Sequence, residues 1–162
     1  MLRLDGTDPG GTMSRGSPRI GQMTIRPVSA GLSAARARVR HLAGEIGVPR
    51  EDSDGLLLAV GEALSNAYLH GTPDPRKNLI RVAWRFANEV LTITVKDEGR
   101  GFVPHEAAAS IAGSAGTCGH GLRLMRTGVD EVHFEFDDGA AVILKKRLDA
   151  GVLRQRSRRD TV

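Results

Sequence analysis

The pattern that most constrains this chain is the alternation of apolar and more polar residues in two neighbouring segments, 80–86 and 91–95. A period of two is typical of β-strands that bury one face and expose the other. Only Asn88 and Glu89 lie in the short connection between them, which predicts a tight hairpin. The apolar positions are Ile80, Val82, Trp84, Phe86, Leu91, Ile93 and Val95. A sheet with one apolar face needs a second layer to cover that face.

The segment from Leu32 to Ile46 carries a helical period that could supply this layer. Its apolar residues recur at spacings of three and four, and Gly47 and Pro49 then end the pattern.

A second helix is expected directly afterwards. Asp52 or Ser53 is a suitable N-cap, and Gly71 and Pro73 break the helix after His70. Its predicted buried stripe consists of Leu57, Val60 and Leu64.

The rest of the chain predicts more strands and one short helix. Residues 23–26 alternate like an edge strand, and a short helix around residues 122–126 leads into a strand at 132–136. A turn at 137–139 then returns the chain into a last strand at 142–146. This order predicts an α+β fold, a two-layer sandwich of a mixed, largely antiparallel β-sheet with helices on one face.

The length of 162 residues fits one domain with a core of its own. We expect a flexible N-terminal arm at 1–20, a folded domain at 21–148 and a basic C-terminal tail at 149–162. The N-terminus lacks the apolar stretch of a signal peptide, and a lone cysteine, Cys118, cannot form an internal disulfide, so we expect a cytoplasmic protein. No histidine has the spacing of a dedicated metal site. The arginines of the tail are Arg154, Arg156, Arg158 and Arg159.

The first candidate site feature is the pair Glu62 and Asn66 on the second predicted helix. A spacing of four places both side chains on one face, one turn apart, where they can contact one ligand. This ridge lies roughly 140–180° from the predicted buried stripe. The alternative is therefore an ordinary solvated helix face.

The second feature is Asp97, which opens the sequence Asp-Glu-Gly-Arg-Gly at the end of a predicted strand. Parity places Asp97 on the same side as Val95 and therefore toward the inner layer. A buried carboxylate needs a partner, either a backbone donor or the amino group of a bound base. The alternative is an acidic turn, because Asp and Gly are frequent in turns.

The third feature is the sequence Gly-His-Gly-Leu at 119–122, which opens the short helix. Its glycines would let backbone amides approach phosphate oxygens at the positive end of the helix. Glycines are also common in loops without any such role.

Together and in this order, residues 62–66, 97–101 and 119–122 resemble the N, G1 and G2 boxes of the histidine-kinase-like ATPase superfamily. The resemblance covers about residues 20–148 and is strongest to the small single-domain branch, the anti-sigma-factor serine/threonine kinases. Three ordered boxes at suitable intervals are more specific than any one of them.

This resemblance implies a site for ATP and Mg²⁺. Asn66 would hold the magnesium, Glu62 would act as general base, Asp97 would bind the adenine amino group, and residues 103–118 would form a lid. The residues implied to contact the nucleotide or its metal are Asn66, Asp97, Gly99, Gly101, Gly119, His120, Gly121 and Leu122.

Two features depart from the family pattern. Ala140 and Ala141 stand where members of this branch often carry threonine, so a hydroxyl contact to the base is absent. His41 lies on a predicted helix but lacks the acidic neighbour of a phosphoacceptor histidine, and we interpret it as a surface residue.

The resemblance implies a kinase that binds a sigma factor and phosphorylates a serine or threonine of an anti-sigma antagonist protein. It raises the option of a homodimer and implies no membrane. The alternative is a partner-switching, ATP-binding module without phosphoryl transfer. A third interpretation, in which the arginine-rich tail contacts nucleic acid, lacks aromatic interleaving and a recognition motif, so we expect no direct nucleic-acid contact.

Overall fold

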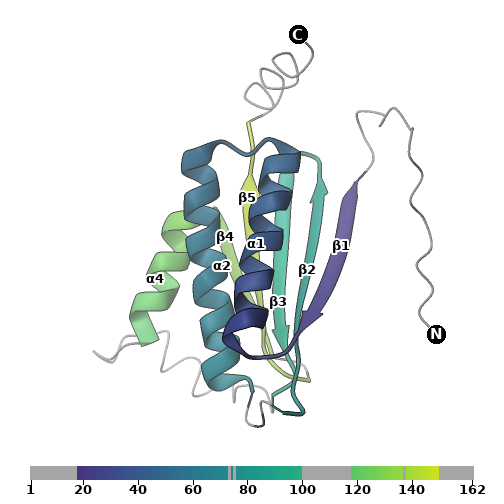
Figure 1. The fold of residues 1–162 in the computed structure, drawn as a ribbon. Coiled ribbons are helices and arrows are strands. Elements are labelled where there is room, and N and C mark those ends of the chain that lie inside the picture. Colours follow the sequence, from purple (N-terminus) through teal and green to yellow (C-terminus); the bar gives the residue numbers. More distant parts are fainter. Residues whose placement is uncertain (1–17, 73, 75, 100–117, 137, 150–162) are drawn as a thin grey trace, which may run out of the picture.

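The computed structural model describes residues 18–72, 74, 76–99, 118–136 and 138–149. Figure 1 shows its elements in chain order: β1 (Arg19–Ile25), α1 (Ser29–Ile46), α2 (Arg50–His70), β2 (Ile80–Ala87), β3 (Val90–Asp97), α4 (Cys118–Gly128), β4 (Glu131–Glu135) and β5 (Ala141–Arg147). Most of the predicted arm (1–17) and the predicted lid (103–117) lie outside the described residues, as does the tail from residue 150 with its arginines.

The strands form one sheet in the order β1-β2-β3-β5-β4. Each of the four pairings is antiparallel, so the described strands include no parallel pair of the kind that a mixed sheet would contain. Asn88 and Glu89 have φ angles of 51° and 63°, as a two-residue type I′ turn requires. The predicted hairpin and the predicted edge strand β1 are thus confirmed.

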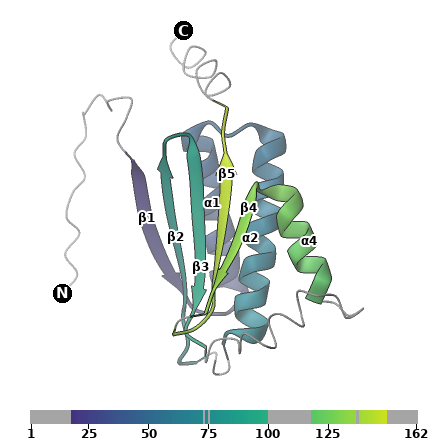
Figure 2. The same cartoon turned by 180° about the vertical axis from the view of Figure 1, so that it is seen from behind.

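The helices α1 and α2 cover one face of the sheet, and Figure 2 shows the opposite face without a helix over it. Strand β3 buries every second residue, ending with Asp97. Helix α4 lies along the flank of α2, next to β4 (Figure 1). The predicted α+β two-layer fold is confirmed.

The core lies between the sheet and the helices. Its largest fully buried side chains are Leu42, Leu56, Leu64, Ile80, Leu91, Ile93, Met125, Leu144, Val39, Val60, Val82 and Val95. No helix in the described part of the chain is long and apolar enough to cross a membrane.

The start of α2 was predicted wrongly. The helix begins at Arg50 and its N-cap is Pro49, without any side-chain cap. The amide of Ser53 donates to the carbonyl oxygen of Pro49 at 2.8 Å, so Ser53 already belongs to the first turn. Glu51 and Asp52 also lie in this turn, where their charge is favourable to the helix dipole.

The buried face of α2 is wider than the predicted stripe. Val60 and Leu64 are fully buried as predicted, but Leu56 takes the place of Leu57, which is only half-buried. Helices α1 and α4 both pack beside α2, so α2 is covered by its neighbouring helices as well as by the sheet.

Two further boundaries differ from the predictions. Strand β1 begins at Arg19, two residues inside the segment expected to be an arm. Helix α4 extends over Cys118–Gly128 rather than about 122–126. Its glycines lower helix propensity, but burial of Met125 against the core provides tertiary stabilisation that propensity does not register.

Candidate functional site

Asp97 lies at the end of β3, is only 4% exposed, and is well partnered. Its Oδ1 accepts hydrogen bonds from the amides of Gly99 (3.0 Å) and Ala140 (3.1 Å). Its own amide donates to the carbonyl oxygen of Ala140 at 3.0 Å. The carboxylate is therefore fixed by backbone groups from two segments, since Ala140 follows the turn between β4 and β5.

The second carboxylate oxygen of Asp97, Oδ2, differs from Oδ1 in its hydrogen bonding. Oδ2 accepts no hydrogen bond from any described residue. It also retains access to solvent, because no fully buried side-chain oxygen in the described part of the chain lacks a partner. Oδ2 can therefore accept a hydrogen bond from a ligand, as a carboxylate oxygen readily does.

Glu62 and Asn66 lie one turn apart on α2, and both are half-buried. Neither side chain forms a hydrogen bond or ion pair within the described residues. A fully solvated helix face, the alternative considered above, would leave them exposed, whereas α4 packs along this flank.

Helix α4 brings the third sequence feature beside Glu62. A Cβ placed on Gly121 would lie 3.1 Å from Oε2 of Glu62, so the first turn of α4 directly adjoins this carboxylate. Seven residues further along α4, Gly128 contacts Gly55, which lies seven residues before Glu62. The two helices therefore run antiparallel, with glycines allowing close approach of their backbones.

The ends of several elements that carry candidate residues lie toward one end of the molecule. In Figure 1 the C-terminal end of α2, the end of β3 and the turn between β4 and β5 lie together at the bottom, and the start of α4 lies beside the lower part of α2. Glu62 and Gly71 are nine residues apart along α2, which corresponds to about 14 Å. Glu62 adjoins Gly121, and Gly71 adjoins Asp97. Nine residues are about two and a half helical turns, so these two groups of residues lie on different sides of the α2 axis and are linked through α2.

The remaining predicted site residues lie in the first turns of α4 or outside the described residues. Gly101 lies outside the described residues, and for Gly119 and His120 the structure describes only their helical backbone in α4. Leu122 lies in the second turn of α4 and is half-buried. The surface assignment of His41 is confirmed, since its side chain is 71% exposed and lies 3.1 Å from Oε1 of Glu45.

Sequence reasoning missed the residues that surround Asp97. Gly71 was interpreted only as a helix breaker and Gly139 only as a turn residue, yet both backbones lie against Asp97. The amide of Ala140, rather than its side chain, contacts the carboxylate. Next to Gly71, the buried Thr72 donates its hydroxyl to the carbonyl oxygen of Tyr68 at 2.6 Å. A backbone contact across the fold leaves no periodic signal in a sequence.

No group of three or more His, Cys, Asp or Glu side chains that could hold a metal ion occurs among the described residues. A hollow of about 550 Å³ is present on the sheet, but it is lined by none of the candidate site residues. Its lining consists of Ile20, Gly21, Gln22, Ala83, Trp84, Arg85, Thr92 and Thr94.

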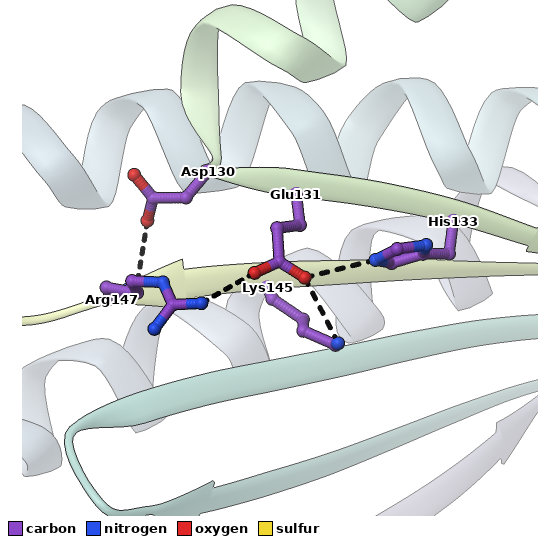
Figure 3. A network of polar contacts seen from close by, with 5 residues as sticks. All are labelled: Asp130, Glu131, His133, Lys145 and Arg147. Atoms are coloured by element: carbon purple, nitrogen blue, oxygen red, sulfur yellow. Dashed lines mark hydrogen bonds and ion pairs between the residues drawn. The ribbon is translucent and has the colours of Figure 1, made fainter.

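A charged network joins the edge strand β4 to β5, and it contains none of the candidate residues (Figure 3). The carboxylate of Glu131 contacts His133 at 3.1 Å, Lys145 at 3.1 Å and Arg147 at 2.7 Å. Hydrogen bonds from His133, Arg147 and Lys145, in this order of size, lower the pKa of Glu131 from its usual 4.5 to about 2. These side-chain contacts link β4 to β5 in addition to the backbone pairing of the two strands.

Comparison with known proteins shows which proteins this chain resembles. The chain is 28% identical over 122 residues to a serine-protein kinase RsbW of Bacillus licheniformis, covering 70% of this chain and 76% of that protein. It is 26% identical over 122 residues to an anti-sigma F factor of Clostridium novyi, covering 72% and 85%.

A similar fold occurs in the crystal structure of the RsbU and RsbW domains of Rv1364c from Mycobacterium tuberculosis. The TM-score is 0.61 at 24% identity, over 80% of this chain. The chain spans only 32% of that longer protein. Residues 27–146 match the family described as the histidine kinase-like ATPase domain, which is about three quarters of the chain. The chain therefore belongs to the histidine kinase-like ATPase domain family.

Proposed function

We propose that this protein is an ATP-binding protein serine/threonine kinase of the anti-sigma type. It binds ATP with Mg²⁺, transfers the terminal phosphoryl group to a serine or threonine of an antagonist protein, and binds a sigma factor. The names of the relatives, a serine-protein kinase and an anti-sigma F factor, support this choice of partners.

One observation carries the proposal. Glu62 and Asn66 are half-buried, lie one turn apart and have no partner within the described residues, while the first turn of α4 adjoins Glu62. Both side chains therefore keep their full hydrogen-bonding capacity for water or a ligand. Asp97, beside the C-terminal end of α2, offers its Oδ2 to a base.

The residues present fit a magnesium ion that is bound mainly by the nucleotide. Mg²⁺ is usually held through one or two protein oxygens together with substrate phosphates and water, rather than by a complete protein cage. The side-chain oxygen of Asn66, which accepts no hydrogen bond from a described residue, can supply one such ligand. When bound, the ion would neutralise phosphate charge. The absence of a carboxylate cluster in the described residues does not conflict with this mode of binding.

In this proposal the carboxylate of Glu62 acts as the general base. It would accept the proton of the attacking serine or threonine hydroxyl as the new oxygen–phosphorus bond forms and the bond from the γ-phosphorus to the β–γ bridging oxygen breaks, with ADP as the leaving group. The amides at the start of α4, next to Gly121, would face the phosphates. Phosphoryl transfer depends mainly on such positioning and charge stabilisation.

The test is phosphoryl transfer from labelled ATP to a candidate antagonist protein by the wild type and by Glu62→Gln. Removing the general base should reduce the transfer rate by about 10²–10⁴-fold while ATP binding is retained. Glu51→Gln, the same chemical change in the exposed first turn of α2, should transfer at the wild-type rate. Equal transfer by Glu62→Gln and wild type would exclude Glu62 as the base. Magnesium-dependent ATP binding without transfer by the wild type would instead favour a non-catalytic partner-switching module.

A further inference from the structure

We infer that Gly71 is a positioning residue for the nucleotide specificity of this site, because only a residue without a side chain leaves room for the Asp97 carboxylate in the orientation that the backbone amides hold. This inference rests on the proposed function, in which Asp97 binds the base. It assigns a role to a residue outside the three sequence features that suggested the site.

The contact between Gly71 and Asp97 leaves no room for a side chain. A Cβ on Gly71 would overlap both Cγ and Oδ2 of Asp97 and would lie 2.5 Å from its Cβ. The backbone of Gly71 has φ −98° and ψ −1°, which any residue can adopt. Glycine is therefore required at this position by proximity to the carboxylate and not by backbone conformation.

Two other glycines complete the enclosure of Asp97. Gly139, with φ 115°, lies against the backbone carbonyl oxygen of Asp97, and a Cβ there would be 3.5 Å from Oδ1. A Cβ on Gly99 would lie 2.5 Å from the carbonyl oxygen of Gly71. The end of α2, the end of β3 and the turn between β4 and β5 thus meet around one carboxylate.

Within this enclosure the two carboxylate oxygens of Asp97 differ in their hydrogen bonding. Oδ1 accepts the amides of Gly99 and Ala140, whereas Oδ2, against the Cα of Gly71, accepts nothing from the described residues. Rotation of the carboxylate would break both backbone hydrogen bonds, and hydrogen bonds to an ionised acceptor are among the stronger ones. Because an ionised carboxylate only accepts hydrogen bonds, the group that meets Oδ2 must be a donor.

The site should therefore select a base with an amino group over one with a carbonyl group at the same position. Discrimination of this kind is strong when a buried polar group is left unpaired by the wrong ligand. A substitution that displaces the carboxylate should weaken this preference for an amino-bearing base, because a displaced Asp97 can no longer accept a well-aligned hydrogen bond from the amino group.

The test compares ATP with inosine triphosphate, which carries a carbonyl in place of the amino group, by calorimetric titration of the wild type, Gly71→Ala and Gly44→Ala. Gly44 is an exposed glycine of α1 with open space around its Cβ position, so the same substitution there should leave both affinities unchanged. In Gly71→Ala the ratio of ATP to inosine triphosphate affinity should fall by about 10-fold or more, as loss of a charged hydrogen bond produces.

The outcomes separate this inference from the proposed function. A wild type that binds no ATP overturns the proposed function itself. A wild type that binds ATP without preference over inosine triphosphate, or a Gly71→Ala variant that keeps the full preference, overturns the inference alone.

A second measurement applies if Gly71→Ala does not fold. Asp97→Gly removes the three Asp97 atoms that a Cβ at position 71 would meet. Gly71→Ala should then lower the melting temperature much less in the Asp97→Gly background than in the wild type. An equal decrease in both backgrounds would contradict the contact on which the inference depends.

Discussion

Asp97 and Leu56 are both buried, but the reasons for their burial differ. Asp97 lies at 4% exposure because backbone amides replace water at Oδ1, whereas Leu56 is fully buried by apolar packing. Burial of a carboxylate contributes nothing favourable by itself. The hydrogen bonds to Oδ1 therefore offset the cost of burying Asp97 and leave Oδ2 available to a further donor.

Leu56 provides a test of the core that does not involve the site. Leu56→Ala should lower the free energy of unfolding by about 2–5 kcal/mol, because it removes buried methyl groups and leaves a cavity. Leu69→Ala, on the same helix but 67% exposed, should change it by no more than about 0.5 kcal/mol. Denaturant unfolding measures both, and similar losses in the two variants would contradict the packing of α2.

Parity along β3 was sufficient to predict that Asp97 points inward, because every second residue of this strand is buried. The partners of Asp97 could not be predicted in the same way. Gly71 and Ala140 are distant in the chain, and their contacts with Asp97 involve a missing side chain and a backbone amide. Neither kind of contact leaves a residue pattern.

Helices α2 and α4 depend on each other for the geometry of the site. A Cβ on Gly128 would overlap the carbonyl oxygen of Gly55, and Gly121 adjoins Glu62 two turns away. Because a helix moves approximately as a rigid rod, the close approach of Gly128 to Gly55 also determines how near Gly121 lies to Glu62.

Gly128→Ala should force α4 away from α2. We expect a loss of about 1–3 kcal/mol in unfolding free energy, typical of overpacking, together with weaker ATP binding as Gly121 moves from Glu62. Gly44→Ala, which introduces the same methyl group into open space, should cause neither effect. Thermal unfolding and nucleotide titration measure the two changes, and a Gly128→Ala variant with unaltered stability would contradict the contact.

Strands β4 and β5 are joined by the network around Glu131, which gives a testable pH dependence. Because folding lowers the pKa of Glu131 from 4.5 to about 2, its stabilising effect is fully present above pH 4.5 and is lost as the pH falls toward 2. Glu131→Gln should therefore lower the melting temperature slightly at pH 7, with a difference from wild type that shrinks below pH 4.5. The effect should be small, since exposed ion pairs contribute little.

Glu135→Gln is the matched control for this prediction. Glu135 lies on the same strand and is exposed, so its replacement should give no pH-dependent difference. A Glu131→Gln difference that stayed constant from pH 7 to below pH 4.5 would show that the ion pairs are not its source.

The hydrophobic periods of the sequence predicted which elements form, but their ends were less predictable. α1, β2 and β3 matched their patterns because each packs one face against one layer. Helix α4 was longer than predicted. Its glycines weaken the helical signal in the sequence, whereas the helix is stabilised by packing on α2. The start of α2 at Arg50 was missed because a proline rather than a polar side chain is the N-cap.

The whole fold packs together elements from three distant parts of the chain. The two layers followed from the order of predicted strands and helices, whereas the packing of α2 against both β3 and α4 depends on tertiary structure (Figure 1). The resemblance to known boxes suggested the candidate residues, and the structure adds the contacts of Gly71 with Asp97 and of Gly121 with Glu62.

The most direct test of this account is a titration with ATP, with and without Mg²⁺, of the wild type, Asn66→Ala and Asp97→Asn. The account predicts that the wild type binds ATP more tightly with Mg²⁺, that Asn66→Ala loses this dependence, and that Asp97→Asn binds about 10-fold or more weakly under both conditions. A wild type that does not bind ATP, or two variants that bind it exactly as the wild type does with the same dependence on Mg²⁺, would contradict a common nucleotide site.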